Sequence, residues 1–332
     1  MSVDLRALDR DDDAELRAYW EVLHEASAER RYAQLPTWSA AQASLRTDRD
    51  DQREVRAAVW RDGRMVGTLA LQAPLHDHTD LAYVFLDVLP SQRRSGVASA
   101  LLEHAEEQAR ALGRMALVGW AFARVGAESP ATAFAAARGF RVELEEGSKV
   151  LDLTTGRDWW ARLAAESAEH HARHRLVTTW SPLPDELVEG YCRLNEAMRG
   201  EMPSGESGDE PERWDAARLR AKEARNARAG RRDLATFALD DAGRAVAFTE
   251  LQVDEATPDR AFQSGTLVLP EARGHRLGLA LKVASLRALV AAYPEVAWIA
   301  TENADVNAPM NAINERLGFR VVERCVEVRK AI

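Results

Sequence analysis

Cysteine is scarce in this sequence, with 2 Cys among 332 residues. Two thiols cannot form the disulfide framework of a small secreted domain. Cys192 falls in a segment with the pattern of a helix, and Cys325 falls in one with the pattern of a strand. Because free cysteine packs as a small apolar residue, we expect both to be core thiols.

Long apolar segments and a surplus of basic residues are also absent. No stretch approaches the roughly 18 uninterrupted apolar residues of a membrane span. The first residues, MSVDLRALDRDDD, are acidic where a signal peptide is basic and then apolar. We therefore expect a cytoplasmic protein with no membrane partner. The net charge of −9 argues against a nucleic-acid partner, because neutralising phosphates needs a surplus of Lys and Arg on one face. A cationic small molecule suits that charge better.

The same order of predicted elements occurs twice along the chain. Each pass has a strand, two helices, a hairpin, an apolar strand ending in Val-x-Pro, a long helix, a strand, a short helix and a closing strand. The first pass covers residues 1–153 and the second covers residues 175–332, with a connecting segment at 154–174. Asp-Gly at 62–63 and the loop at 240–243 mark the two hairpin turns. Strands alternating with helices predict an α/β class, with a mixed sheet in each of two tandem domains.

A basic loop between a Val-x-Pro strand and a long helix occurs once in each pass. The first follows Val88-Leu89-Pro90 and the second follows Val268-Leu269-Pro270. Such a loop aims unpaired backbone N–H groups and the positive end of the helix dipole at one point, which suits a phosphate or pyrophosphate. Small residues matter there because a Cβ would keep the anion from the backbone. Two such loops in matching context are a strong signal.

With these loops the sequence resembles the GNAT acetyltransferase family, in a tandem layout similar to that of mycothiol synthase. The family pattern is Gln/Arg-x-x-Gly-x-Gly/Ala after a Val-x-Pro strand. The resemblance implies acetyl-CoA as co-substrate and a V-shaped opening between the fourth and fifth strands, where the pantetheine arm lies beside the fourth strand. The residues that it assigns to the coenzyme are Val88, Arg93, Arg94, Ser95, Gly96, Val97 and Ala98 in the first half, and Leu267, Val268, Arg273, His275, Arg276, Leu277, Gly278, Leu279 and Ala280 in the second.

The second half departs from the family pattern at His275, which stands where Gln or Arg is usual. His275 either donates to phosphate or caps the loop while Arg273 and Arg276 provide the charge. The tyrosine that often protonates the departing thiolate in this family is absent from both halves, since Ala135 and Asn314 occupy its position. We expect Asn314 to orient a water or the thioester, and Asn303, at the end of the fifth strand, to contact coenzyme or substrate.

Acetyl transfer to an amine also needs a base, because a protonated amine has no lone pair for attack. The family's frequent base position is Ala82 or Phe262 here, so the usual assignment fails in both halves. Glu250 lies among apolar residues of the third strand of the second half, where partial burial would raise its pKa. We expect Glu250 to act through water, with Asp87 as the alternative in the first half. Asp87 and Val88 point to opposite faces of their strand, so only one of them can line the opening.

These residues predict an enzyme that moves acetyl from acetyl-CoA to a primary amine of a small molecule by direct attack. We expect the chemistry in the C-terminal half, no metal, and a monomer or homodimer. His170 and His174 lack companion ligands at metal spacing. The acidic segment from Glu201 to Glu212 either is plain solvated surface or selects cationic amines. Two alternatives remain open: a regulatory protein that binds acyl-CoA without turnover, and an N-acetyltransferase acting on proteins or peptides.

Overall fold

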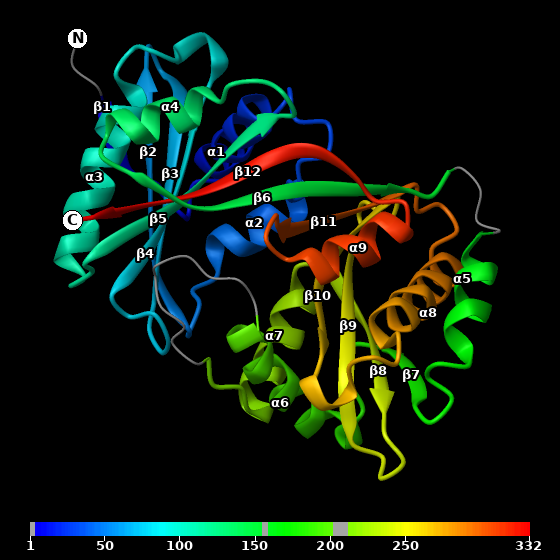
Figure 1. Cartoon of the computed structure of the whole chain (residues 1–332). Helices are drawn as coiled ribbons and strands as arrows, with labels where there is room; N and C mark the ends of the chain where they lie inside the picture. Colours follow the sequence, from blue (N-terminus) through cyan, green and yellow to red (C-terminus); the bar gives the residue numbers. More distant parts are fainter. Residues whose placement is uncertain (1–3, 155–158, 202–211) are drawn as a thin grey trace. The chain divides into compact units, whose positions relative to one another are not determined.

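The computed structural model describes residues 4–154, 159–201 and 212–332 (Figure 1). The chain divides into two compact units. Unit 1 consists of Met1–Glu145 and Arg324–Ile332, and unit 2 of Glu146–Glu323.

Unit 1 is a mixed sheet with helices on its faces. Its elements are β1 (Asp4–Ala7), α1 (Asp13–Ala26), α2 (Trp38–Arg46), β2 (Gln52–Arg61), β3 (Arg64–Pro74), β4 (Leu81–Val88), α3 (Val97–Ala111), β5 (Ala116–Arg124), α4 (Pro130–Ala137) and the start of β6 (Arg141–Asp152). The strand order is β1-β2-β3-β4-β5, and all neighbours are antiparallel except β4 and β5. Arg61 pairs with Arg64 across Asp62-Gly63, which confirms the predicted hairpin turn.

Unit 2 repeats this order. Its elements are α5 (Trp159–Ala168), β7 (Arg175–Trp180), α6 (Asp185–Glu201), α7 (Ala216–Arg228), β8 (Arg231–Leu239), β9 (Ala245–Asp254), β10 (Arg260–Val268), α8 (Leu277–Ala292), β11 (Trp298–Ala304), α9 (Ala308–Arg316) and the start of β12 (Arg320–Ala331). The strand order is β7-β8-β9-β10-β11, and here only β10 and β11 are parallel. The expected α/β class with mixed sheets is therefore confirmed.

The two units exchange the ends of their closing strands. Residues 146–152 of β6 pair antiparallel with β11 and belong to unit 2. Residues 324–331 of β12 belong to unit 1, where β12 neighbours β5. The boundaries expected at residues 153 and 175 separate the two sequence repeats. The compact units differ from these repeats, because each unit includes a strand segment from the other repeat.

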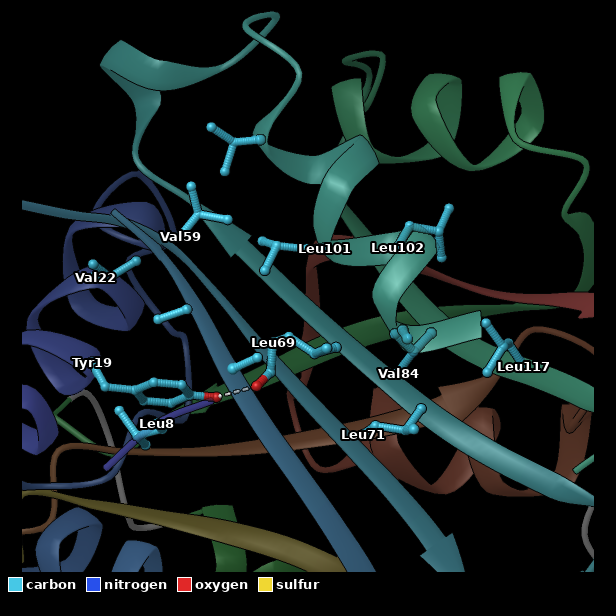
Figure 2. Packing of buried hydrophobic residues seen from close by; sticks show 14 of the residues in the cluster. Leu8, Tyr19, Val22, Val59, Leu69, Leu71, Val84, Leu101, Leu102 and Leu117 are labelled. Carbon is cyan, nitrogen blue, oxygen red and sulfur yellow. Dashed lines mark hydrogen bonds between the residues drawn. The ribbon is translucent and has the colours of Figure 1, made fainter. Parts of the chain in front are cut away.

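The core of unit 1 lies between the sheet and its helices (Figure 2). On the helix after Pro90, five apolar residues at helical spacing are buried: Val97, Leu101, Leu102, Ala105 and Ala109. On α1 the Tyr19 hydroxyl donates to the Leu69 carbonyl at 3.0 Å, and burial raises the pKa of that phenol. Both cysteines are buried, as expected.

Candidate functional site

The two parallel strands of each unit are paired only at one end. In unit 1 the register of β4 and β5 runs from Leu81–Ala116 to Tyr83–Val118, although the strands continue to Val88 and Arg124. In unit 2 the register of β10 and β11 runs from Arg260–Trp298 to Phe262–Ala300, and β10 then bulges between Gln263 and Thr266. The carboxyl-terminal parts of both strand pairs are therefore not paired with each other, which corresponds to the opening that the family resemblance implies.

The loops that follow these strands share a backbone conformation. Two positions in each loop have positive φ: Arg94 at 61° and Gly96 at 87° in unit 1, Gly274 at 87° and Arg276 at 52° in unit 2. These positions correspond when Val88 is matched with Val268. Glycine, which adopts positive φ without strain, stands at the second position in one loop and at the first in the other. The two loops thus share a backbone conformation although glycine occupies a different position in each.

The helices after these loops begin without a side-chain cap. Neither α3, after Gly96, nor α8, after Arg276, has a side-chain hydrogen bond at its N-cap. Five other helices have one, from Asp12, Thr37, Ser129, Asp215 and Asn307. Unsatisfied N–H groups at a helix start carry partial positive charge and bind anions. The missing caps mark the first turns of α3 and α8 as candidate phosphate sites.

The surroundings of the two first turns differ. In α3, Val97 is buried and residues 98–100 are half-buried, whereas all four residues 277–280 of α8 are buried. A Cβ on Gly278 would lie 2.9 Å from Ile313 Cδ1. The start of α8 is therefore packed against α9, and the start of α3 is the more accessible of the two.

The basic side chains of the unit 2 loop are engaged by acidic and carbonyl groups of the same unit. Arg276 Nη1 lies 3.0 Å from Glu166 Oε1 on α5, and that carboxylate also pairs with Arg316 at 2.7 Å. Arg273 Nη2 lies 2.5 Å from Glu201 Oε2. His275 Nδ1 lies 3.2 Å from the His170 carbonyl oxygen.

The unit 1 loop has no carboxylate partner of this kind among the described contacts. Arg93 Nη2 donates to the Ala26 carbonyl at 3.2 Å, and the Arg94 side chain is exposed. Arg61 Nη2 donates to the Ser95 carbonyl at 2.7 Å. No carboxylate therefore neutralises the positive charge of this loop within the described part of unit 1. In unit 2, by contrast, the charge of the matching loop is neutralised.

The strand faces beside the loops differ as well. By alternation Tyr83, Phe85 and Asp87 share one face of β4, and this face is half-buried or exposed. By strand register the matching positions of β10 are Phe262, the bulge at Ser264 and Gly265, and Leu267. Phe262 is half-buried, Leu267 is buried, and a Cβ on Gly265 would lie 3.1 Å from Met198 Sδ on α6. Near the loop, side chains of unit 2 thus occupy the part of the face that is accessible at Phe85 and Asp87 in unit 1.

Asp87 is the titratable group on the accessible face. Burial raises its pKa to about 6, against the opposing influence of Arg30 and Arg93. Thr68 lies directly opposite Asp87 in the β3–β4 register, and its Oγ1 is buried with no hydrogen-bond partner among the described residues. The matching pair in unit 2 is Leu267 with Phe248, which is apolar. An unsatisfied hydroxyl beside a carboxyl group that titrates near neutral pH suits a water held for proton transfer.

Glu250, the base expected in the second half, lies in a polar cluster of unit 2 and is only 8% exposed. Its carboxylate lies 2.7 Å from Lys222 Nζ and accepts hydrogen bonds from Tyr191 Oη at 2.9 Å and Ser264 Oγ at 3.2 Å. Burial lowers the pKa of Lys222, but Glu250, Tyr191 and Asp233 together outweigh this and leave the pKa raised. The lone pairs of Glu250 are engaged within the protein, and its catalytic role stays a prediction.

Asn303 and Asn314, the two asparagines expected at the site, contact each other. Asn314 is fully buried and donates to Asn303 Oδ1 at 2.5 Å. Its own Oδ1 accepts from Lys282 Nζ at 2.9 Å. Burial, and then the charge of Lys149, lowers the pKa of Lys282 to about 7. Asn307 is the N-cap of α9, and its side chain accepts a hydrogen bond from the Met310 N–H.

The sequence reasoning missed Lys282, Lys222 and Tyr191. Lys282 had a visible signal, because it is the lone cation in the otherwise apolar stretch LGLALKVASL. Lys222 and Tyr191 had none, because their partner Glu250 is distant along the chain. The described residues contain no group of three or more His, Cys, Asp or Glu that could hold a metal.

Among the described helices none is long and apolar enough to cross a bilayer. Most of the acidic segment, residues 202–211, lies outside the described residues. The coenzyme contacts expected for both loops stay predictions.

Comparison with known proteins supplies the family. The sequence model of the Acetyltransferase (GNAT) family matches residues 17–140. No curated protein matches the chain. Among solved structures, a tandem GNAT protein from the clavulanic acid biosynthesis pathway is 28% identical with a TM-score of 0.82, over 99% of this chain and 98% of that one.

A GCN5-related N-acetyltransferase from Sphaerobacter thermophilus shares the fold at 16% identity, with a TM-score of 0.68 over 99% of this chain and 95% of that one. The similarity in layout to mycothiol synthase stays a prediction. Together, these matches show that residues 17–140 belong to the Acetyltransferase (GNAT) family and that the chain has the fold of two GNAT-like units.

Proposed function

We propose that this protein is an N-acetyltransferase that uses acetyl-CoA and binds it at the start of α3 in unit 1. The observation that carries this proposal is the uncapped and accessible first turn of α3, next to Arg93 and Arg94. The acceptor is the primary amine of a small molecule. The C-terminal half was the expected seat of chemistry, but the packing of its loop by Glu166, Glu201 and Ile313 favours unit 1.

In the proposed reaction the amine nitrogen attacks the thioester carbonyl directly. A C–N bond forms, the C–S bond breaks, and the electron pair of that bond leaves on sulfur. Backbone N–H groups where β4 and β5 separate polarise the carbonyl. Asp87 accepts the proton lost by the amine, through a water beside Thr68, and the departing thiolate takes a proton from solvent because Ala135 supplies none.

The test introduces a negative charge where the phosphates are to bind. Ala98→Asp places a carboxylate at the second residue of α3, a position where acidic residues favour the helix, so folding is preserved. Calorimetry on the parent protein should give one acetyl-CoA per chain. The variant should raise the Kd at least tenfold, because like charges then meet at the site.

A matched control is Ala217→Asp, the same change at the second residue of α7, where Ala217 is exposed and Asp215 is the cap. It should leave the Kd within about twofold. Unchanged binding in Ala98→Asp would place the coenzyme elsewhere and overturn the proposal. Thiol release with amines then separates an enzyme from a regulatory protein that holds acyl-CoA without turnover, and release with peptides alone would favour a protein acetyltransferase.

A further inference from the structure

Three aromatic rings form a platform on the accessible strand face of unit 1. Tyr83 and Phe85 on β4 both stack on Trp120 of β5, with centroid distances of 5.7 and 5.5 Å and interplanar angles of 29° and 21°. Trp120 lies beyond the last paired register, Tyr83–Val118, so the platform covers the place where the strands separate. Phe85 is 39% exposed, although large apolar side chains are usually buried.

The platform shares its face with Asp87. Asp87 is two residues beyond Phe85 on the same strand, which corresponds to about 7 Å along the strand. Phe122, two residues beyond Trp120 on β5, carries Arg30 over its ring, with Cζ 3.6 Å from the centroid. The face therefore runs from an open aromatic surface toward a carboxyl group, flanked by a guanidinium that is stacked on a ring.

Unit 2 keeps only one of these rings at the matching positions. When the strand registers are matched, Phe262 corresponds to Tyr83, the bulge at Ser264 and Gly265 to Phe85, and Glu302 to Trp120, so Phe85 and Trp120 have no counterpart. These two rings are thus not required by the fold. If they only filled a core, burial of Phe85 would be expected, whereas more than a third of it meets solvent.

This inference rests on the proposed function. We infer that the acyl acceptor is an amine that carries an aromatic ring, which stacks on the exposed part of Phe85, held in place by Trp120, while its nitrogen lies toward Asp87. Offset stacking gives a ring an advantage over an aliphatic group of the same size. The carboxylate complements the amine, which is a cation in solution before it loses its proton. If the acceptor carried many hydroxyl groups, those hydroxyls would lie against the three rings without hydrogen-bond partners.

The experiment compares three probe amines in a thiol-release assay with acetyl-CoA: 2-phenylethylamine, 2-cyclohexylethylamine and putrescine. The first two differ only in the ring, and putrescine is a cation without one. We expect kcat/KM for 2-phenylethylamine to exceed that for the cyclohexyl amine by about fivefold, in line with stacking beyond simple burial. Putrescine should be the poorest of the three.

Variants assign the preference to the platform. Trp120→Leu should abolish the preference for the phenyl ring mainly through KM, and Trp120→Phe, which keeps a ring, should retain most of it. Phe85→Leu, at an exposed position that tolerates the change, tests the same surface if Trp120→Leu folds poorly. Trp298→Leu, at the first residue of β11 in unit 2, is the control and should leave the preference unchanged.

Equal kcat/KM for the phenyl and cyclohexyl amines would overturn the inference. A uniform loss with both amines in Trp120→Leu and Phe85→Leu would do the same. Release of thiol with none of the probes, while acetyl-CoA still binds at α3, also overturns it and leaves the coenzyme site standing. Failure of acetyl-CoA to bind overturns the proposed function itself, so the two failures are distinguishable.

Discussion

The loops before α3 and α8 have the same backbone conformation, but the first is accessible and the second is packed against side chains of its own unit. Both carry two residues of positive φ and lead into an uncapped helix. In unit 2, Glu166 and Glu201 neutralise the basic side chains and Ile313 packs on Gly278. In unit 1 the first turn is accessible, and a carboxyl group and three rings lie on the strand face beside it. A repeated motif therefore establishes a repeated fold, whereas the chemistry depends on side chains supplied from elsewhere in each unit.

The largest expected effect comes from deleting residues 324–332. These residues belong to unit 1, where Val328 is buried in the core and Lys330 pairs with Glu106. Their removal should cost unit 1 at least about 5 kcal/mol, from lost burial and strand hydrogen bonds. Hydrogen exchange should show lost protection in β4 and β5 and retained protection in β8 and β9. Equal loss in both units would contradict the division of the chain at Glu323.

Removing Lys222 should destabilise unit 2 and spare coenzyme binding. Lys222→Met leaves Glu250 and, at 3.4 Å, Asp233 without their cation. Loss of one partner from a buried ion pair costs about 3–5 kcal/mol. Urea unfolding measures the loss, and calorimetry checks that the Kd for acetyl-CoA stays within twofold. A large change in that Kd would mean that the Glu250 cluster contributes to coenzyme binding. The coenzyme site would then involve unit 2, contrary to the proposal.

Substituting the two candidate bases compares the units directly. Asp87→Asn should lower kcat/KM about 100-fold, the range for loss of a general base. In the parent protein a limb of the pH profile should rise through about pH 6, because only the ionised carboxylate accepts a proton. That limb should disappear in Asp87→Asn and persist in Glu250→Gln. The reverse result would return the chemistry to the C-terminal half.

Lys282→Met should stabilise unit 2 at acidic pH. The folded-state pKa of Lys282 is about 7 because of burial and Lys149, whereas an unfolded lysine titrates near 10.5. Between these values the unfolded state binds a proton that the folded state lacks, so this lysine makes stability rise with pH across that window. At pH 6 the cost of the buried charge is fully present, and replacing it with an apolar group should gain about 2 kcal/mol. Denaturation at pH 6 and pH 9 should show the gain shrinking at the higher pH.

The smallest effect is expected from alanine substitutions of Arg93 and Arg273, which occupy matching positions in the two loops. Arg93→Ala should weaken acetyl-CoA binding about tenfold, the value of one charge-assisted hydrogen bond. Arg273→Ala should leave it within twofold, because Arg273 is paired with Glu201. Equal losses would indicate that both units bind the coenzyme.

Local sequence signals predicted most of the fold. Asp62-Gly63 specified a hairpin because both residues adopt positive φ, and the spacing from Val97 to Ala109 specified a buried helix face. The repeated Val-x-Pro loop identified the family. These features depend on residues within one or two elements of each other, which is the range over which propensity and periodicity act.

The site was less predictable because its decisive contacts are long-range. Glu166 reaches Arg276 across 110 positions, and Lys222 reaches Glu250 across 28. Nothing in the loop sequence shows that its charge is already neutralised. Asp87 was visible as a candidate, but its unpartnered neighbour Thr68 appears only when β3 and β4 are placed side by side.

The exchanged strands also constrain the order in which the protein can mature during synthesis. The N-terminal repeat leaves the ribosome first, yet the strand segment beside β5 is encoded at residues 324–331. Unit 2, by contrast, receives residues 146–152 before the rest of its own sequence is made. The part of the chain translated first therefore completes its sheet last, after nearly all of the other unit has emerged.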